Sequence, residues 1–293
     1  MAAVTSDPAH AALGRLLALP GVEEAVDGAR EACTALRWHE ALRRRIPESA
    51  AESRVRGAAA SAMLEGAEPA GSQGSVALVR ELVRGAVDWQ ERAEDPVWRV
   101  LAGAVRATSA TEQVGGPQLR SPGQVLAGLH TAATGGLLPA GQVGRPRVAG
   151  EAALEWTELG PAPDVAEMHA RLGLVHELLA GVTSGRLPAL LVAAVVHAEI
   201  VVARPFVLGN GVVARAVERV VVRVGGLDPT GVAVPEAGHA DRAGADYRGA
   251  LTAYASGGPE GVRLWVLHCA DAVERAAAEG GRIADAVRAG RLG

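Results

Sequence analysis

The feature that most constrains this chain is an almost unbroken apolar run from Leu187 to Ala203, in which His197 and Glu199 are the only ionisable side chains. The run is shorter than the roughly 20 residues that a membrane-spanning helix needs. A helix that is apolar on all sides has to be covered by the rest of a globular domain. The run therefore predicts a central helix buried in the core of a globular protein.

The composition indicates which class of fold surrounds that helix. Hydrophobic residues make up 49% of the chain but aromatic residues only 3%, so the core has to be built from alanine, valine and leucine. Alanine has the highest helix propensity of all residues. Apolar residues recur at three- and four-residue steps from Val22 to Ile46, before Pro47, and again from Glu48 to Leu64. We therefore expect an all-α protein.

Two segments rich in glycine and proline divide the chain. The first follows Gly66, which can end the preceding helix in a left-handed conformation. It predicts an N-terminal helical segment over residues 1–74 and a helical core domain over residues 75–293. The second spans residues 135–163, and its sequence GRPRVAG predicts a small β-hairpin flap on the core.

Charge and cysteine usage exclude several classes of function. All 29 basic residues are arginine, so no lysine is available as a P-loop cation, a Schiff base or a general base. The net charge of −4 argues against a nucleic-acid-binding protein that relies on a basic surface. The N-terminus has no basic region before its short apolar run, and Cys33 and Cys269 lie far apart. We expect a cytoplasmic protein with reduced cysteines that binds neither nucleic acid nor membrane; its oligomeric state stays open.

The segment RPFVLGNGVVAR, residues 204–215, carries most of the chemistry. Pro205 ends the apolar helix, and a Gly-Asn-Gly turn at residues 209–211 opens the next helix, which we expect over Asn210 to Val224. Glycines let backbone N–H groups approach a ligand closely, and the free N–H groups of a helix N-terminus attract anions. Arg215 lies a little over one turn into that helix and can reach back to the same place. The pattern predicts a phosphate-binding loop; the alternative is an ordinary turn between two helices.

The same segment resembles the signature of the Fic (Fido) family, HPF-x-(D/E)-GNGR-x-x-R, whose members transfer AMP from ATP to protein hydroxyl groups. The matching positions are Pro205, Phe206, Gly209, Asn210, Gly211 and Arg215. His197 stands seven residues before Arg204, where the family often has a histidine, and the resemblance covers roughly residues 121–218. It implies a Fic-like helical core, ATP bound at the Gly-Asn-Gly turn and Arg215, and a protein target held at the flap, near residues 142–150.

A second motif lies on the predicted N-terminal segment. The family's inhibitory helix carries (S/T)-x-x-x-E-(G/N), and this chain has Ser61, Glu65 and Gly66 in that order at the end of a predicted helix. The resemblance implies an ion pair between Glu65 and Arg215 that blocks productive placement of the nucleotide. Two interpretations stay open: a structural clamp between the N-terminal segment and the core, or a regulatory switch.

Three positions depart from the family motif. The histidine that acts as general base is Arg204 here, and arginine stays protonated and cannot accept a proton. The acidic residue that holds Mg²⁺ is Leu208, which has no oxygen to offer a hard cation, and the first motif arginine is Val212. We therefore expect no metal ligand in the motif, and Arg204 marks the catalytic position without being competent as a base.

These observations leave three functions open. The first is a catalytically impaired Fic-like protein that keeps an anion- or nucleotide-binding loop. The second is an active nucleotidyl- or phosphotransferase with displaced catalytic groups, and the third is a non-catalytic helical interaction protein. Outside the motif, we expect His197 to be a paired core histidine, and Asp241, Asp246 and Tyr247 to form a solvated helix face.

Overall fold

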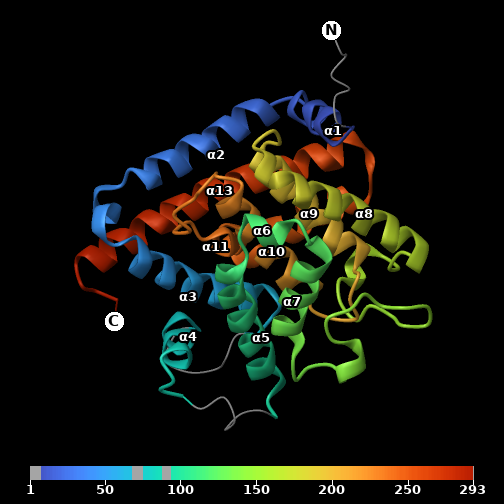
Figure 1. Cartoon of the computed structure of the whole chain (residues 1–293), viewed down its shortest axis with the longest axis horizontal. Coiled ribbons are helices and arrows are strands. Elements are labelled where there is room, and N and C mark those ends of the chain that lie inside the picture. The colour runs from blue at the N-terminus through green and yellow to red at the C-terminus, as the bar shows by residue number, and fades with distance from the viewer. Residues whose placement is uncertain (1–7, 68–74, 88–93, 293) are drawn as a thin grey trace.

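The fold is all-α, as the composition predicts. The computed structural model describes residues 8–67, 75–87 and 94–292 (Figure 1). Within these ranges the α-helices are α1 (Pro8–Leu17), α2 (Val22–Arg37), α3 (Ile46–Leu64), α4 (Ser75–Val83), α5 (Pro96–Ala110), α6 (Gly116–Leu119), α7 (Pro122–Thr134), α8 (Val165–Gly181), α9 (Ala189–Ala203), α10 (Asn210–Val224), α11 (Pro235–His239), α12 (Ala245–Ala255) and α13 (Gly258–Arg288). The only β-structure among the described residues is an isolated bridge between Gly135 and Leu138.

The predicted central helix is α9. Its residues from Leu190 to Ala203 are all buried, because α8 and α10 pack along it and α1, α12 and α13 cover its remaining sides. In Figure 1, α9 and α10 lie in the middle of the molecule and the other helices surround them. A helix without a polar face is stable in water only in such a position.

Helix α10 is buried although it carries charged residues. Every residue from Asn210 to Val222 is buried, including Arg215, Glu218 and Arg219. Helices α3, α5, α7 and α11 pack around it. Each of its charges therefore has to be paired inside the protein. This packing also brings α3, the helix with the inhibitory-type motif, against the segment that resembles the Fic signature.

The N-terminal helices pack on the rest of the chain. In Figure 1, α2 lies alongside α13, and α3 packs against α5, α11 and α13. The predicted helix from Val22 to Ile46 is wrong in its second half, since α2 ends at Arg37 and a 3-10 turn over Glu40–Arg44 leads into α3. Pro47 stands in the first turn of α3, where its missing N–H loses no hydrogen bond. The boundary predicted after residue 74 falls in residues 68–74, outside the described part of the chain.

The predicted β-hairpin is wrong. The described segment over residues 143–155 consists of turns and irregular chain. Arg147 N–H donates to Pro205 O at 2.7 Å, which ties the segment to the loop after α9 instead of to a second strand. Pro146 has no N–H to donate, and Gly144 adopts a φ of 74°, so a two-stranded ladder is interrupted within the segment.

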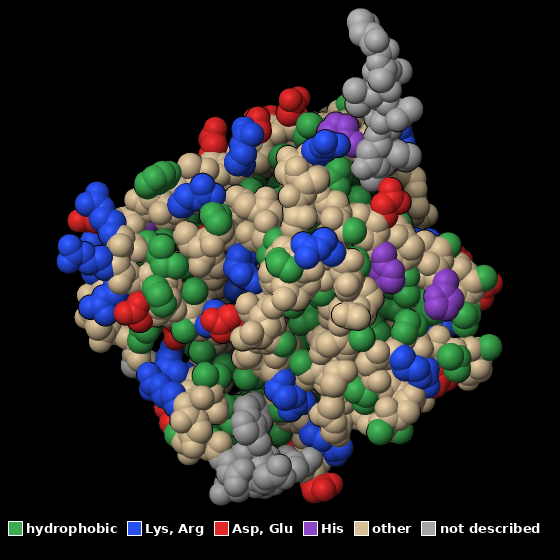
Figure 2. All heavy atoms as spheres, in the orientation of Figure 1, with side chains coloured by type: hydrophobic (Ala, Val, Ile, Leu, Met, Phe, Trp, Pro, Cys, Tyr) green, Lys and Arg blue, Asp and Glu red, His purple; other side chains and the backbone are tan. Residues whose placement is uncertain are grey.

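The surface carries mixed charge. Arginine side chains are scattered over the face shown in Figure 2 and gather only at one edge, near the turn between α2 and α3, where Arg43, Arg44 and Arg45 are exposed. This face offers no broad basic surface. Within the described residues, no helix combines the length and the apolar character that crossing a membrane requires.

Candidate functional site

The segment that resembles the Fic motif forms a tight loop between α9 and α10. Arg204 adopts a left-handed conformation (φ 43°) at the end of α9, and Gly209 adopts another (φ 88°) directly before α10. The Asn210 side chain closes the loop, since its Oδ1 accepts from Phe206 N–H and its Nδ2 donates to Phe206 O, both at 2.9 Å. A Cβ atom on Gly209 would meet Thr134 Cγ2 at 2.6 Å. Glycine is therefore needed there for its φ and for the close packing.

The donors of this loop hold an anion from the chain itself. The Glu155 carboxylate accepts from Gly209 N–H at 3.0 Å, from Asn210 N–H, and from Asn210 Nδ2 at 2.6 Å. Backbone N–H groups at a helix N-terminus have no partner within the helix and attract negative charge. The loop therefore offers the donors that an anion-binding site needs, and in this structure their acceptor is Glu155.

Glu155 was not among the residues that the sequence singled out. It lies 55 positions before Asn210, in the glycine- and proline-rich segment over residues 135–163, and no local pattern distinguishes it there from Glu151 or Glu158. Burial and the nearby charge of Glu65 raise the pKa of Glu155 to about 7, while the hydrogen bonds from the loop act in the opposite direction. This carboxylate therefore changes its charge near neutral pH.

Arg204, at the position of the family's histidine, is engaged by backbone carbonyl groups. Its guanidinium donates to Trp156 O at 3.0 Å, to Gly160 O at 2.8 Å and to Pro161 O at 2.8 Å. The Arg204 carbonyl accepts from Arg147 Nε at 2.8 Å. Arg204 thus fastens the turn over residues 156–161 to the loop, and it offers no proton acceptor because a guanidinium has only donors.

Arg215 is fully buried and is paired on all three of its nitrogens. Its Nε donates to Ser61 Oγ at 3.0 Å, its Nη1 to Tyr247 OH at 3.3 Å, and its Nη2 to Ser61 O at 3.2 Å. The Nη2 atom also forms an ion pair with Glu65 Oε1 at 2.5 Å. Glu65 directly follows α3, and Gly66 comes next with a φ of 76°. The motif near the end of α3 is therefore in direct contact with the motif arginine of α10.

Leu208 and Val212 stand where the motif has an acidic residue and its first arginine. Val212 is buried and belongs to the main hydrophobic core. The carbonyl of Leu208 accepts from His130 Nε2 at 3.0 Å. Magnesium requires oxygen ligands, and neither of the two side chains has one. The side chains at these two positions therefore do not fit a magnesium ion.

His130 connects the loop to the segment predicted as a flap. Its ring stacks on Phe206 with the centroids 3.9 Å apart, and its Nδ1 accepts from Gly144 N–H at 2.9 Å. The proton of the neutral ring is therefore on Nε2, which donates to Leu208 O. Burial lowers the pKa of His130 to about 4, so this neutral form persists at physiological pH.

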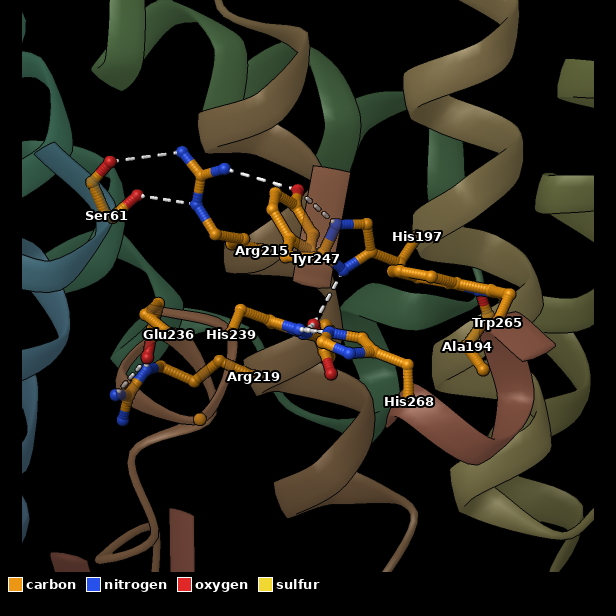
Figure 3. A network of polar contacts seen from close by, with 12 residues as sticks. Ser61, Ala194, His197, Arg215, Arg219, Glu236, His239, Tyr247, Trp265 and His268 are labelled. Atoms are coloured by element: carbon orange, nitrogen blue, oxygen red, sulfur yellow. Dashed lines mark hydrogen bonds and ion pairs between the residues drawn. The ribbon is translucent and has the colours of Figure 1, made fainter. Parts of the chain in front are cut away.

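His197 and Tyr247 lie beside Arg215 in the core (Figure 3). His197 is fully buried, with its Nδ1 2.6 Å from Glu218 Oε2 and its Nε2 2.8 Å from Tyr247 OH. Tyr247 is also fully buried, so the predicted solvated face is wrong for this residue, although Asp246 is exposed. Consecutive residues of a helix point about 100° apart, and α12 directs Tyr247 inward.

Comparison with known proteins shows that solved structures share this architecture. No protein-family model and no curated protein matches the chain. Its structure is similar to that of a Fic family protein from Desulfovibrio desulfuricans G20, with a TM-score of 0.67 and 19% identity over 89% of this chain and 74% of that chain. It is also similar to Fic-1 from C. elegans, with a TM-score of 0.61 and 17% identity over 96% of this chain and 74% of that chain. This chain has a Fic-like fold. At these identities the likeness shows the fold alone, and the chemistry of this Fic-like chain has to be argued from its own side chains.

Proposed function

We propose that this Fic-like protein does not catalyse AMP transfer and binds nucleotide phosphates at its 209–211 loop in competition with Glu155. The observation that carries the proposal is the Glu155 carboxylate on the N–H groups of Gly209 and Asn210. It supports a loop that binds anions. A nucleotide phosphate presents oxygen acceptors of the same kind and can replace the carboxylate on the same donors.

The lack of a general base at position 204 supports the proposal that the chain does not catalyse AMP transfer. Attack of a protein hydroxyl on ATP requires removal of the hydroxyl proton, and Arg204 cannot take it. Loss of a general base lowers a rate by about 10²–10⁴-fold. Leu208 and Val212 remove, in addition, two groups that neutralise phosphate charge, on which phosphoryl-type transfer depends.

The contacts of His197, Arg204 and Arg215 also bear on the two alternatives, an active transferase and a non-catalytic interaction protein. An active transferase needs another base, and His197, two helical turns before Arg204, is fully buried with both ring nitrogens paired. A non-catalytic interaction protein is favoured by the use of Arg204 and Arg215 as internal ties. It differs from the proposed function in one measurable respect, because it binds no nucleotide. A protein partner at residues 142–150 is compatible both with the proposed nucleotide-binding protein and with a non-catalytic interaction protein.

Calorimetry with ATP and with ADP tests the binding loop. We compare the full-length wild type with Glu155→Ala and with a control, Glu158→Ala, since the Glu158 side chain is on the same segment but is 41% exposed and pairs with Arg248. At about pH 8.5, where Glu155 is ionised, loss of a competing set of charge-assisted hydrogen bonds worth about 2 kcal/mol is expected to tighten nucleotide binding about 30-fold in Glu155→Ala. The control should bind as the wild type does. No heat at millimolar nucleotide in any of the three proteins would leave only the interaction protein.

Incubation with labelled ATP and Mg²⁺ or Mn²⁺ tests whether the chain transfers AMP. We expect no transfer to the protein itself or to proteins of a lysate, either from the wild type or from Glu65→Gly, in which Arg215 loses its carboxylate partner. If either protein causes label to appear on itself or on a lysate protein, the proposal that the chain is inactive is overturned and an active transferase is supported.

A further inference from the structure

We propose that His197, Glu218 and His239 form a buried site for a divalent transition-metal ion of the zinc class. The three side chains come from α9, α10 and α11, and their ligand atoms all lie within 4.8 Å of one another. The cluster is separate from the 209–211 loop and does not depend on the function proposed for that loop.

Both histidines direct a ring nitrogen at the same carboxylate oxygen. His197 Nδ1 lies 2.6 Å from Glu218 Oε2, and His239 Nε2 lies 2.7 Å from it. The two imidazole rings lie edge to face, with their planes inclined by 71° (Figure 3). Two imidazole nitrogens and one carboxylate oxygen are a donor set that zinc, cobalt(II) and iron(II) accept in proteins.

Each histidine is held in this orientation by a partner on its other nitrogen. His197 Nε2 lies 2.8 Å from Tyr247 OH, and His239 Nδ1 lies 3.1 Å from His268 Nε2 (Figure 3). Metal-binding histidines usually have such a partner on the nitrogen that does not coordinate, because it fixes the ring and its tautomer. Neither ring can turn away from Glu218 without breaking its second contact.

The buried carboxylate of Glu218 also has to be compensated by its neighbours. Its side chain is 1% exposed, and a buried carboxylate is strongly unfavourable without compensation. The two buried arginines of the same helix are paired with other carboxylates, Arg215 with Glu65 and Arg219 with Glu236. The compensation has to come from the two histidines, as hydrogen bonds from their N–H groups, as a proton on one imidazole, or as a metal ion held by both.

A metal ion in this position is structural. The side chains of His197 and His239 are fully buried, and Trp265 packs against both rings, with centroids 5.2 and 6.0 Å away. Three protein ligands leave one position of a tetrahedral ion, and the burial of the site closes that position to a substrate. The ion would fasten α9, α10 and α11 to one another, and it has to be bound as the chain folds.

The metal content of the full-length protein tests the proposal. The chain is expressed without a polyhistidine tag in zinc-supplemented and in zinc-depleted medium, and its metal is measured by mass spectrometry after gel filtration. We expect about one zinc per chain from the supplemented medium and a lower Tm for the protein from the depleted medium. Expression with cobalt should give a visible absorption band from the bound ion. Glu218→Gln and His239→Gln should lose the metal, whereas His176→Gln, a histidine outside the cluster, should keep it.

A further variant tests the role of His268, which contacts the proposed ligand His239 but is not itself a ligand. His268→Gln keeps all three ligands but removes the ring behind His239, so metal affinity should fall about 10–100-fold without being abolished. Wild-type protein that holds neither zinc nor cobalt, and whose Tm is the same from both media, would overturn the proposal and identify a metal-free cluster held by hydrogen bonds. Since these readouts use the wild type, they decide the question even if a ligand variant fails to fold.

Discussion

Replacement of Glu65 by alanine is expected to destabilise the protein strongly through Arg215. The guanidinium of Arg215 is fully buried, and Glu65 is its ion-pair partner; the other groups that it contacts, Ser61 and Tyr247, are neutral. Glu65→Ala therefore leaves a positive charge in the core without a counter-charge. Removing one member of a buried pair costs about 3–5 kcal/mol of unfolding free energy.

This loss can be converted into a change in Tm. An unfolding entropy of about 2.1 cal/mol/K per residue gives about 0.6 kcal/mol/K for a chain of 293 residues. Glu65→Ala should therefore lower the Tm by about 5–8 °C in thermal unfolding followed by circular dichroism. Glu158→Ala is the matched control, because its pair with Arg248 has side chains that are 41% and 44% exposed. Such a surface pair contributes about 0–1 kcal/mol, or less than about 2 °C.

A second substitution tests the cause of the loss. Arg215→Met in the Glu65→Ala background removes the unpaired charge and keeps a long side chain in the core, so part of the Tm should be recovered. If Glu65→Ala lowers the Tm no more than Glu158→Ala does, the argument from the buried charge is refuted. A double variant less stable than Glu65→Ala alone would refute it as well, because the guanidinium would then be stabilising without a counter-charge.

Two further predictions concern packing and pH. Gly103→Ala places a Cβ 2.0 Å from Ala133 O, in the backbone of α7. This substitution should lower the unfolding free energy by at least about 1–3 kcal/mol in urea denaturation. Gly128→Ala, which has nothing within 4 Å of the new Cβ, should not lower it. Glu155 has a pKa of about 7, so the carboxylate that competes with nucleotide loses its charge as the pH falls from 8 to 6. The nucleotide affinity of the wild type relative to Glu155→Ala should therefore rise by up to about tenfold per pH unit as the pH falls towards 7, and it should level off below pH 7. A constant ratio in calorimetry would contradict the proposed competition.

Local patterns in the sequence predicted the elements that build the site. The central helix α9 follows from an apolar run that no surface position could satisfy, and α10 has the predicted bounds, Asn210–Val224. The left-handed residues Gly66 and Gly209 are also local features, because their φ values depend mainly on the absence of a Cβ atom. The helical prediction failed around Pro47, where the same residue type can end one helix or begin the next.

The acceptor on the loop could not be predicted in this way. Glu155 and Asn210 are joined only because the segment over residues 143–155 folds back along the loop, and no periodic pattern in the sequence records that path. The sequence groups Tyr247 with Asp241 and Asp246, which predicts a solvated face. Its burial depends on which face of α12 the neighbouring helices cover.

The sequence by itself determined the all-α class, the buried α9 and the Gly-Asn-Gly entry into α10, since each rests on neighbouring residues along the chain. Only the tertiary structure decided where the charges go: Glu155 onto the loop, Glu65 onto Arg215, and two histidines onto Glu218. The physical reason is that the pairing of buried charges depends on distances between helices. Those distances are set by how the whole core packs and by no single segment.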